Sequence, residues 1–173
     1  MVARPPPDAP VSEHCGTCRS CLDACPTGAI VAPYEVDARL CISYLTIELK
    51  GSIAIALRPL IGNRIYGCDD CQLCCPWNCY AQIGDPAFAV RHGLDSTPLT
   101  ELFCWTEAEF ESRLAGSAIR RIGYERWLRN IAVALGNAPA SAATRSALDA
   151  RLDHPSALVR EHVSWALAAA HGK

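Results

Sequence analysis

Two cysteine-rich stretches decide the fold of this chain: CGTCRSCLDACP at residues 15–26 and CDDCQLCCP at residues 68–76. The first has the spacing C-x2-C-x2-C-x3-C-P. The second repeats the end of that pattern, C-x2-C-x3-C-P, and Cys41 lies far upstream as the missing first cysteine. A tight loop with cysteines two residues apart points successive sulfurs inward, so each stretch can surround one inorganic cluster.

The spacing is that of bacterial-type ferredoxins with two 4Fe–4S clusters, in which the fourth cysteine, followed by proline, ligates the other cluster. Exchanging the fourth cysteines between the two stretches predicts two ligand sets. The first cluster is expected on Cys15, Cys18, Cys21 and Cys75, and the second on Cys25, Cys41, Cys68 and Cys71. Of the 11 cysteines, this leaves Cys74, Cys79 and Cys104 unassigned.

Residues 68–79 also allow a rival set, built from the three cysteines of CDDCQLC together with Cys79. Cys79 lies four residues further on and is followed by tyrosine rather than proline. The rival set would also leave Cys41 and Cys75 without a role. We therefore prefer the two exchanged sets, and note that Cys74, between two predicted ligands, could replace one in a damaged cluster.

Other uses of so many cysteines fit less well. Structural zinc would favour two C-x2-C pairs, and a disulfide framework would suit a short secreted chain. Residues 1–10 are proline-rich and lack the apolar core of a secretory segment. Reduced thiols in this spacing predict a cytoplasmic protein. No run of 18 apolar residues is present, so we expect no membrane partner. We also expect a monomer.

The 173 residues leave room for one ordinary domain or two small ones, and we predict an α+β chain. A proline-rich flexible lead is expected over residues 1–12, a two-cluster ferredoxin-like domain over 13–90, and a HEAT-like helical domain over 99–173. The helical part rests on the capping-box pattern at Thr106 and Glu109, and on two loosely similar apolar helices about one helix pair apart. An ordinary helical bundle remains the alternative.

Finer expectations concern the ends of these helices. After the helix that begins at the capping box, a second is predicted over residues 124–135 with Gly136 as its C-cap. A third is predicted over 142–152, and a fourth with Pro155 in its first turn. A turn into a short strand is predicted at 27–31, and a second strand or turn near 34–36 would close a small hairpin. Residues 41–50 match both strand and helix patterns. We expect His154 and His162 to be capping or surface residues, and Asp69 and Asp70 to be solvated.

Several longer blocks resemble the epoxyqueuosine reductase family. They are CISYLTIELKG at 41–51, IGNRIYGCDDCQ at 61–72, CPWN at 75–78, RWLRN at 126–130, ALGN at 134–137, and residues 153–167. The resemblance implies an oxidoreductase with two 4Fe–4S clusters and cobalamin that reduces epoxyqueuosine to queuosine in tRNA. The clusters would pass single electrons, supplied by an external donor, to the cobalt.

In that family the cobalamin domain and the catalytic acid lie in an N-terminal half that has no counterpart in these 173 residues. The resemblance therefore implies the C-terminal half of the enzyme, inactive alone and with no catalytic residue of its own. The net charge of −2 does not indicate nucleic acid, but Lys50, Arg58 and Arg64 lie in the family-like blocks and are expected to contact the tRNA anticodon region. The alternatives are a free-standing two-cluster electron carrier for another reductase and a non-catalytic tRNA-binding scaffold.

Overall fold

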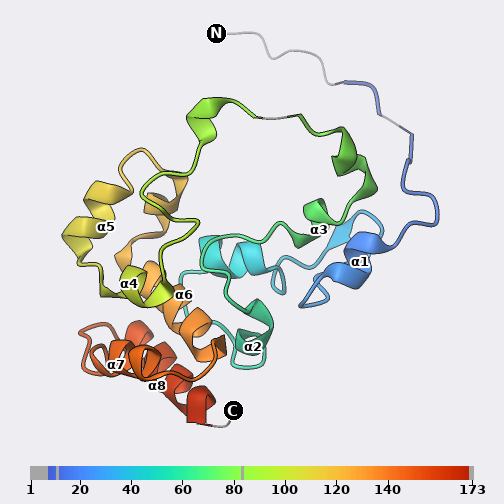
Figure 1. Cartoon of the computed structure of the whole chain (residues 1–173). Coiled ribbons are helices and arrows are strands. Elements are labelled where there is room, and N and C mark those ends of the chain that lie inside the picture. The colour runs from blue at the N-terminus through green and yellow to red at the C-terminus, as the bar shows by residue number, and fades with distance from the viewer. Residues whose placement is uncertain (1–7, 11, 83, 172–173) are drawn as a thin grey trace, which may run out of the picture.

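The computed structural model describes residues 8–10, 12–82 and 84–171, so most of the predicted flexible lead lies outside it (Figure 1). In chain order the elements are α1 (Ser20–Ala24), β1 (Ile30–Ala32), β2 (Glu35–Val36), the π-helix η1 (Tyr44–Glu48), α2 (Arg58–Ile61), α3 (Asp70–Leu73), the 3-10 helices η2 (Pro76–Tyr80) and η3 (Pro86–Phe88), α4 (Leu99–Cys104), α5 (Glu107–Arg113), the 3-10 helix η4 (Ala118–Ile122), α6 (Tyr124–Asn137), α7 (Ala142–Asp149) and α8 (Ala157–His171). Helices thus dominate an α+β chain with little sheet.

Each of the two cysteine-rich stretches contains a short helix, α1 in the first and α3 in the second. These helices, α1 and α3, contact each other and lie side by side in Figure 1. The predicted hairpin is confirmed: β1 pairs with β2 in antiparallel register, with Ile30 opposite Val36. Contact between α1 and α3 brings the two cysteine motifs together, as the exchange of fourth ligands requires.

Residues 41–50, for which the pattern was ambiguous, contain the π-helix η1. The Leu49 N–H donates to the Tyr44 carbonyl oxygen, five residues back, at 2.9 Å. The Thr46 hydroxyl donates to the Ile42 carbonyl oxygen at 2.8 Å, which satisfies this polar group although Thr46 is completely buried. Leu45 and Thr46 thus enter the core, and the segment ends in an extended residue, Leu49.

The second half of the chain packs around α6, the orange helix near the centre of Figure 1. Ten of its residues are buried, including Trp127, and its main contact is with α8. The predicted capping box is confirmed: the Glu109 N–H donates to the Thr106 hydroxyl at 3.2 Å, and the Thr106 N–H donates to the Glu109 carboxylate at 2.8 Å. No helix among the described residues has the length and apolarity needed to cross a membrane.

Two predictions about helix ends are wrong. Gly136 lies inside α6 rather than capping it, since the helix continues to Asn137. A Cβ atom on Gly136 would lie 2.7 Å from Trp165 Cζ3 and 2.8 Å from Ala166 Cα. The glycine is therefore there to let α8 approach closely. Pro155 precedes α8 instead of lying in its first turn, and the Ser156 hydroxyl accepts a hydrogen bond from the Val159 N–H at 3.2 Å.

The hydrophobic core crosses from the cysteine-rich half into the helical half. Ile42, Leu45, Ile53 and Ile61 form one buried cluster with Val133 of α6, and Trp165 of α8 packs against it. Helices α6 and α8 therefore fix the position of the segment that runs from the predicted ligand Cys41 to Cys68.

Candidate metal centre

The first predicted ligand set surrounds one cavity of about 430 Å³. Cys15 and Cys18 lie in the turn before α1, Cys21 lies in that helix, and Cys75 lies directly before η2. These cysteines, separated by up to 60 residues, all line the same cavity. Trp77 and Tyr80 also line it, with ring centroids 5.9 Å apart.

The second predicted set lines a separate cavity of about 90 Å³, beside the β1–β2 hairpin, and its members are Cys25, Cys41, Cys68 and Cys71. Burial raises the pKa of the Cys71 thiol, and the neighbouring thiolates of Cys68, Cys41 and Cys25 raise it further. Burial is also the main cause of the raised pKa of Cys68. The four sulfurs share one cavity, so their thiolates repel one another, and a cationic iron centre would relieve this repulsion.

Backbone donors around Cys25 favour its thiolate. Burial acts to raise the pKa of Cys25, but backbone N–H groups at Ile30, Thr27 and Ala29, together with the Thr27 hydroxyl, lower it overall. The Ala29 N–H donates to the Cys25 sulfur at 3.2 Å. Hydrogen bonds to cluster sulfurs are one of the means by which proteins set the reduction potential of iron–sulfur centres.

The predicted ligand thiols are arranged around spaces rather than around a point. Among the described residues, no group of three or more His, Cys, Asp or Glu side chains is arranged to hold a metal ion. The eight predicted ligands instead surround cavities, four to each, and Cys79 also lines the first. A cubane is larger than an ion, so its ligands must stand around a space rather than meet at a point. The rival set is not brought together, because Cys79 lines the first cavity while Cys68 and Cys71 line the second.

The three predicted RNA-contacting residues have different environments. Lys50 is exposed, next to Gly51 in the segment after η1. The Arg64 side chain is 28% exposed, forms an ion pair with Asp70, and donates to the Ile61 carbonyl oxygen at 3.0 Å. Asp70 is therefore an ion-pair partner rather than the solvated charge that was expected.

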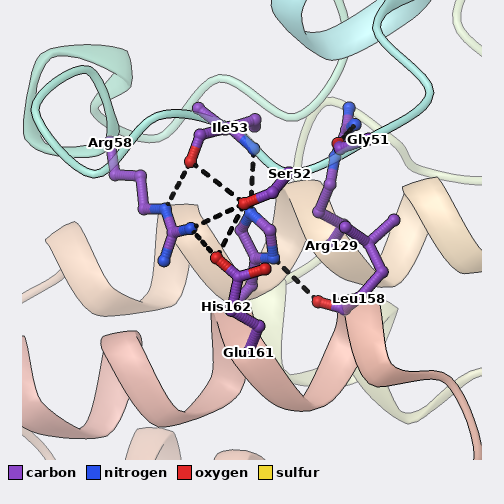
Figure 2. A network of polar contacts seen from close by, with 8 residues as sticks. All are labelled: Gly51, Ser52, Ile53, Arg58, Arg129, Leu158, Glu161 and His162. Atoms are coloured by element: carbon purple, nitrogen blue, oxygen red, sulfur yellow. Dashed lines mark hydrogen bonds and ion pairs between the residues drawn. The ribbon is translucent and has the colours of Figure 1, made fainter.

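Arg58 lies in the interior, where a phosphate cannot reach it. The residue is 1% exposed. Its Nε donates to the Ile53 carbonyl oxygen at 2.8 Å, and its Nη2 donates to the Ser52 hydroxyl at 3.0 Å and forms an ion pair with Glu161 of α8 (Figure 2). This position overturns the expectation that Arg58 contacts tRNA. A buried guanidinium needs such partners, and here they join residues 52–58 to α8.

His162 is also in this network, and the expectation of a capping or surface role for it is wrong. It is 0% exposed, its Nε2 accepts a hydrogen bond from the Ile53 N–H at 3.2 Å, and its Nδ1 lies 2.7 Å from the Leu158 carbonyl oxygen (Figure 2). Burial lowers its pKa to about 4, so the imidazole is neutral at pH 7. The buried apolar residues Val159 and Ala166, three before and four after it, were the sequence signal that placed it on the inner face.

Arg129 holds the backbone on both sides of Lys50, a position that sequence reasoning missed. It is completely buried on α6 and donates to the carbonyl oxygens of Leu45, Leu49 and Gly51 at 2.6–2.7 Å. Burial lowers its pKa to about 10, a value at which it still carries its charge at pH 7. Arg129 directly follows the buried Leu128 in the sequence. Nothing in this local pattern indicated that Arg129 would donate hydrogen bonds to the backbone around Lys50.

These features define an iron–sulfur protein. Residues 14–78 match the model of a family described as "4Fe-4S double cluster binding domain". Over 95% of its length the chain is 66% identical to the epoxyqueuosine reductase of Burkholderia pseudomallei, and over 94% it is 59% identical to that of Escherichia coli, covering 43% of each protein. The chain is thus homologous to epoxyqueuosine reductase and spans less than half the length of these curated relatives.

Solved structures agree with this relationship. The epoxyqueuosine reductase of Streptococcus thermophilus superimposes with a TM-score of 0.82 at 30% identity, over 99% of this chain and 45% of that one. A crystal structure of epoxyqueuosine reductase with an epoxyqueuosine-modified tRNA stem loop superimposes with a TM-score of 0.86 at 33% identity, over 95% and 44%. The fold is therefore shared along nearly the whole chain.

Proposed function

We propose that this chain is the iron–sulfur, electron-transferring and tRNA-facing part of an epoxyqueuosine reductase, an oxidoreductase that reduces epoxyqueuosine to queuosine in tRNA. The observation that carries the proposal is the division of eight cysteines into two cavities, four in each, in the sets that the exchange of fourth ligands requires. Homology to enzymes with this activity along 94–95% of the chain supports it.

The ligands follow from the two cavities. Cys15, Cys18, Cys21 and Cys75 would hold the first 4Fe–4S cluster, and Cys25, Cys41, Cys68 and Cys71 the second. When bound, such clusters would supply one-electron transfer, with an external donor as the source of electrons. Because each motif contributes three thiolates to one cluster and its proline-followed cysteine to the other, the two centres are held close, as a relay needs.

The remaining length of the enzyme would supply cobalamin and the group that protonates the departing epoxide oxygen. Protonation is needed because an alkoxide is a poor leaving group at neutral pH. We assign the chain's own residues to holding the clusters and setting their potentials, for example through the hydrogen bond from the Ala29 N–H to the Cys25 sulfur. The reduced thiols that this requires support a cytoplasmic location.

For the RNA we propose Lys50, with a smaller contribution from Arg64, as contacts to phosphates of the anticodon region. The exposure of Lys50 and the fixed backbone on both sides of it support this role. The similar fold of a reductase crystallised with a tRNA stem loop is consistent with it.

We also propose that α4–α8 are a HEAT-like unit and that residues 13–90 are the two-cluster domain, which α6 and α8 support from one side.

The first experiment measures iron and acid-labile sulfide per chain after anaerobic reconstitution, followed by EPR of the reduced protein. We expect about eight irons and two interacting 4Fe–4S signals. Cys15→Ala should remove the first cluster only and Cys41→Ala the second only. Cys104→Ala, outside both cavities, is the control and should keep about eight irons. About four irons in the unsubstituted chain, or zinc in place of iron, would contradict the proposal.

A second measurement separates this function from that of a free-standing electron carrier. The loaded chain is combined with the cobalamin-binding part of a related reductase and supplied with a reductant and an epoxyqueuosine-modified stem loop. We expect queuosine to form only when both parts are present. An electron carrier for another reductase would reduce neither the cobalamin nor the modified stem loop.

A further inference from the structure

The first cavity contains a fifth cysteine. We propose that Cys79 is a reserve ligand of the first cluster, able to take over the iron that Cys75 holds; this inference rests on the function proposed above. Cys79 lies in η2, four residues after Cys75, and lines the same cavity of about 430 Å³ as the four predicted ligands. The second cavity is lined by four cysteines and no more.

The backbone of η2 explains why Cys79 reaches this cavity. The Asn78 N–H donates to the Cys75 carbonyl oxygen at 2.9 Å, and the Ala81 N–H donates to the Asn78 carbonyl oxygen at 3.0 Å. These bonds close tight 3-10 turns, with about three residues per turn. Cys79 therefore stands about one turn beyond Cys75, and Trp77 and Tyr80 on either side of it line the same cavity.

The other two unassigned cysteines are placed differently. Cys74 lies near the first set, since the thiolates of Cys21, Cys75 and Cys18 add to the effect of burial in raising its pKa. Its thiol, however, donates to the Cys71 carbonyl oxygen at 3.5 Å, and it is not among the residues that line the first cavity. Cys104 ends α4 in the helical half, outside both cavities. Cys79 is thus the spare thiol with direct access.

The exchange would replace one thiolate by another. The bond between iron and the Cys75 sulfur breaks, a bond between the same iron and the Cys79 sulfur forms, and the Cys79 proton passes to Cys75 through solvent. Charge and oxidation state are unchanged, so no oxidant or reductant is needed. The first cavity is the one where a spare ligand would be useful, because Cys15 and Cys18 are exposed whereas all four cysteines of the second set are partly buried.

Cys75→Ala tests the proposal directly, with iron per chain and EPR of the reduced chain as readouts. If Cys79 replaces Cys75, this variant keeps about eight irons and its first-cluster signal is shifted, while Cys75→Ala/Cys79→Ala falls to about four. Cys71→Ala is the matched control from the second set, whose cavity is lined by no further cysteine among the described residues, and it should fall to about four. Alkylation with iodoacetamide and mass spectrometry should label Cys79 in the loaded unsubstituted chain and leave it protected in Cys75→Ala.

The proposal is overturned if Cys75→Ala loses as much iron as Cys75→Ala/Cys79→Ala. It is also overturned if Cys74→Ala/Cys75→Ala loses the iron of the first cluster and Cys75→Ala/Cys79→Ala keeps it. Should Cys75→Ala fail to fold, Cys79→Ala alone still decides, because Cys79 is exposed. Its first cluster should lose iron to a chelator several-fold faster than that of Cys104→Ala, and equal rates would refute the reserve role. Failure of the function proposed above would be seen separately, as fewer than eight irons in the unsubstituted chain.

Discussion

Arg129 Nη1 lies 2.6 Å from the carbonyl oxygen of Leu49, and the same nitrogen lies 2.7 Å from that of Gly51. A buried arginine of α6 therefore holds the backbone on both sides of Lys50, the exposed residue that we assign to tRNA. Arg129 Nη2 and Nε also donate to Asn130 Oδ1, whose amide nitrogen donates to the Thr46 carbonyl oxygen at 2.8 Å. Residues 45–51, which include Lys50, are thus joined to α6 through their main-chain carbonyl oxygens.

Arg129→Met should destabilise the chain strongly. The substitution keeps an unbranched side chain but removes the donor to the carbonyl oxygens of Leu45, Leu49 and Gly51, and the bond to Leu45 is buried. We expect the free energy of unfolding to fall by about 3 kcal/mol, measured by urea denaturation of the reconstituted chain. Arg39→Met, at an exposed arginine paired only with Asp37, is the control and should leave the midpoint nearly unchanged. Equal midpoints for the two variants would contradict the role of Arg129.

Lys50→Gln should weaken binding of a tRNA anticodon stem loop without changing the fold. Loss of one phosphate contact reduces the slope of log affinity against log salt by about 0.7–1. Fluorescence anisotropy at several salt concentrations measures both affinity and slope. Arg120→Gln is the control, because it removes the same charge from an arginine that already pairs with Glu111. Identical affinities for Lys50→Gln, Arg120→Gln and the unsubstituted chain would remove Lys50 from the interface.

His162 should make the protein less stable in mild acid. Its pKa is lowered to about 4 by burial, below the usual 6.5, so the folded state binds its proton less readily than the unfolded state. The stability that the neutral imidazole contributes is complete above about pH 6.5 and is lost as the pH falls towards 4. The pKa of His154 is lowered in the same direction, mainly by burial, so it acts in the same window.

To isolate His162, the free energy of unfolding is measured at pH 7 and at pH 5 for the unsubstituted chain and for His162→Gln. The quantity compared is the drop between the two pH values. Gln removes the titrating ring and can still accept a hydrogen bond from the Ile53 N–H. We expect a smaller drop in His162→Gln, and an intermediate one in His154→Gln, whose ring is only partly buried. A drop as large in His162→Gln as in the unsubstituted chain would show that another group causes the acid sensitivity.

Gly136→Ala should force α6 and α8 apart. The added methyl group would meet Trp165 at 2.7 Å and the Ala166 backbone at 2.8 Å, and the backbone has little freedom to yield. Overpacking of this kind costs about 1–3 kcal/mol, and thermal or urea unfolding would measure it. Gly51→Ala is the control, because a Cβ atom there meets nothing within 4 Å. A stability of Gly136→Ala at or above that of Gly51→Ala would show that the helices adjust.

The local parts of the fold could be predicted because each depends on neighbouring residues. The hairpin after Cys25 and the capping box at Thr106 and Glu109 are examples, and so are the cysteine spacings of residues 15–26 and 68–76. A pattern of residue types within one turn or one strand is enough to specify these features. The blocks shared with epoxyqueuosine reductase added the class of enzyme, since they extend well beyond the cysteines.

What the sequence could not decide concerns residues far apart along the chain. Whether an arginine such as Arg58 faces solvent or pairs with Glu161, 103 residues later, depends on how α8 packs against residues 52–58. The same packing buries His162 against the Ile53 N–H and makes Gly136 a contact residue instead of a cap. Charge, hydrogen-bonding capacity and small size are properties of the residue, but burial and partner come only with the tertiary structure.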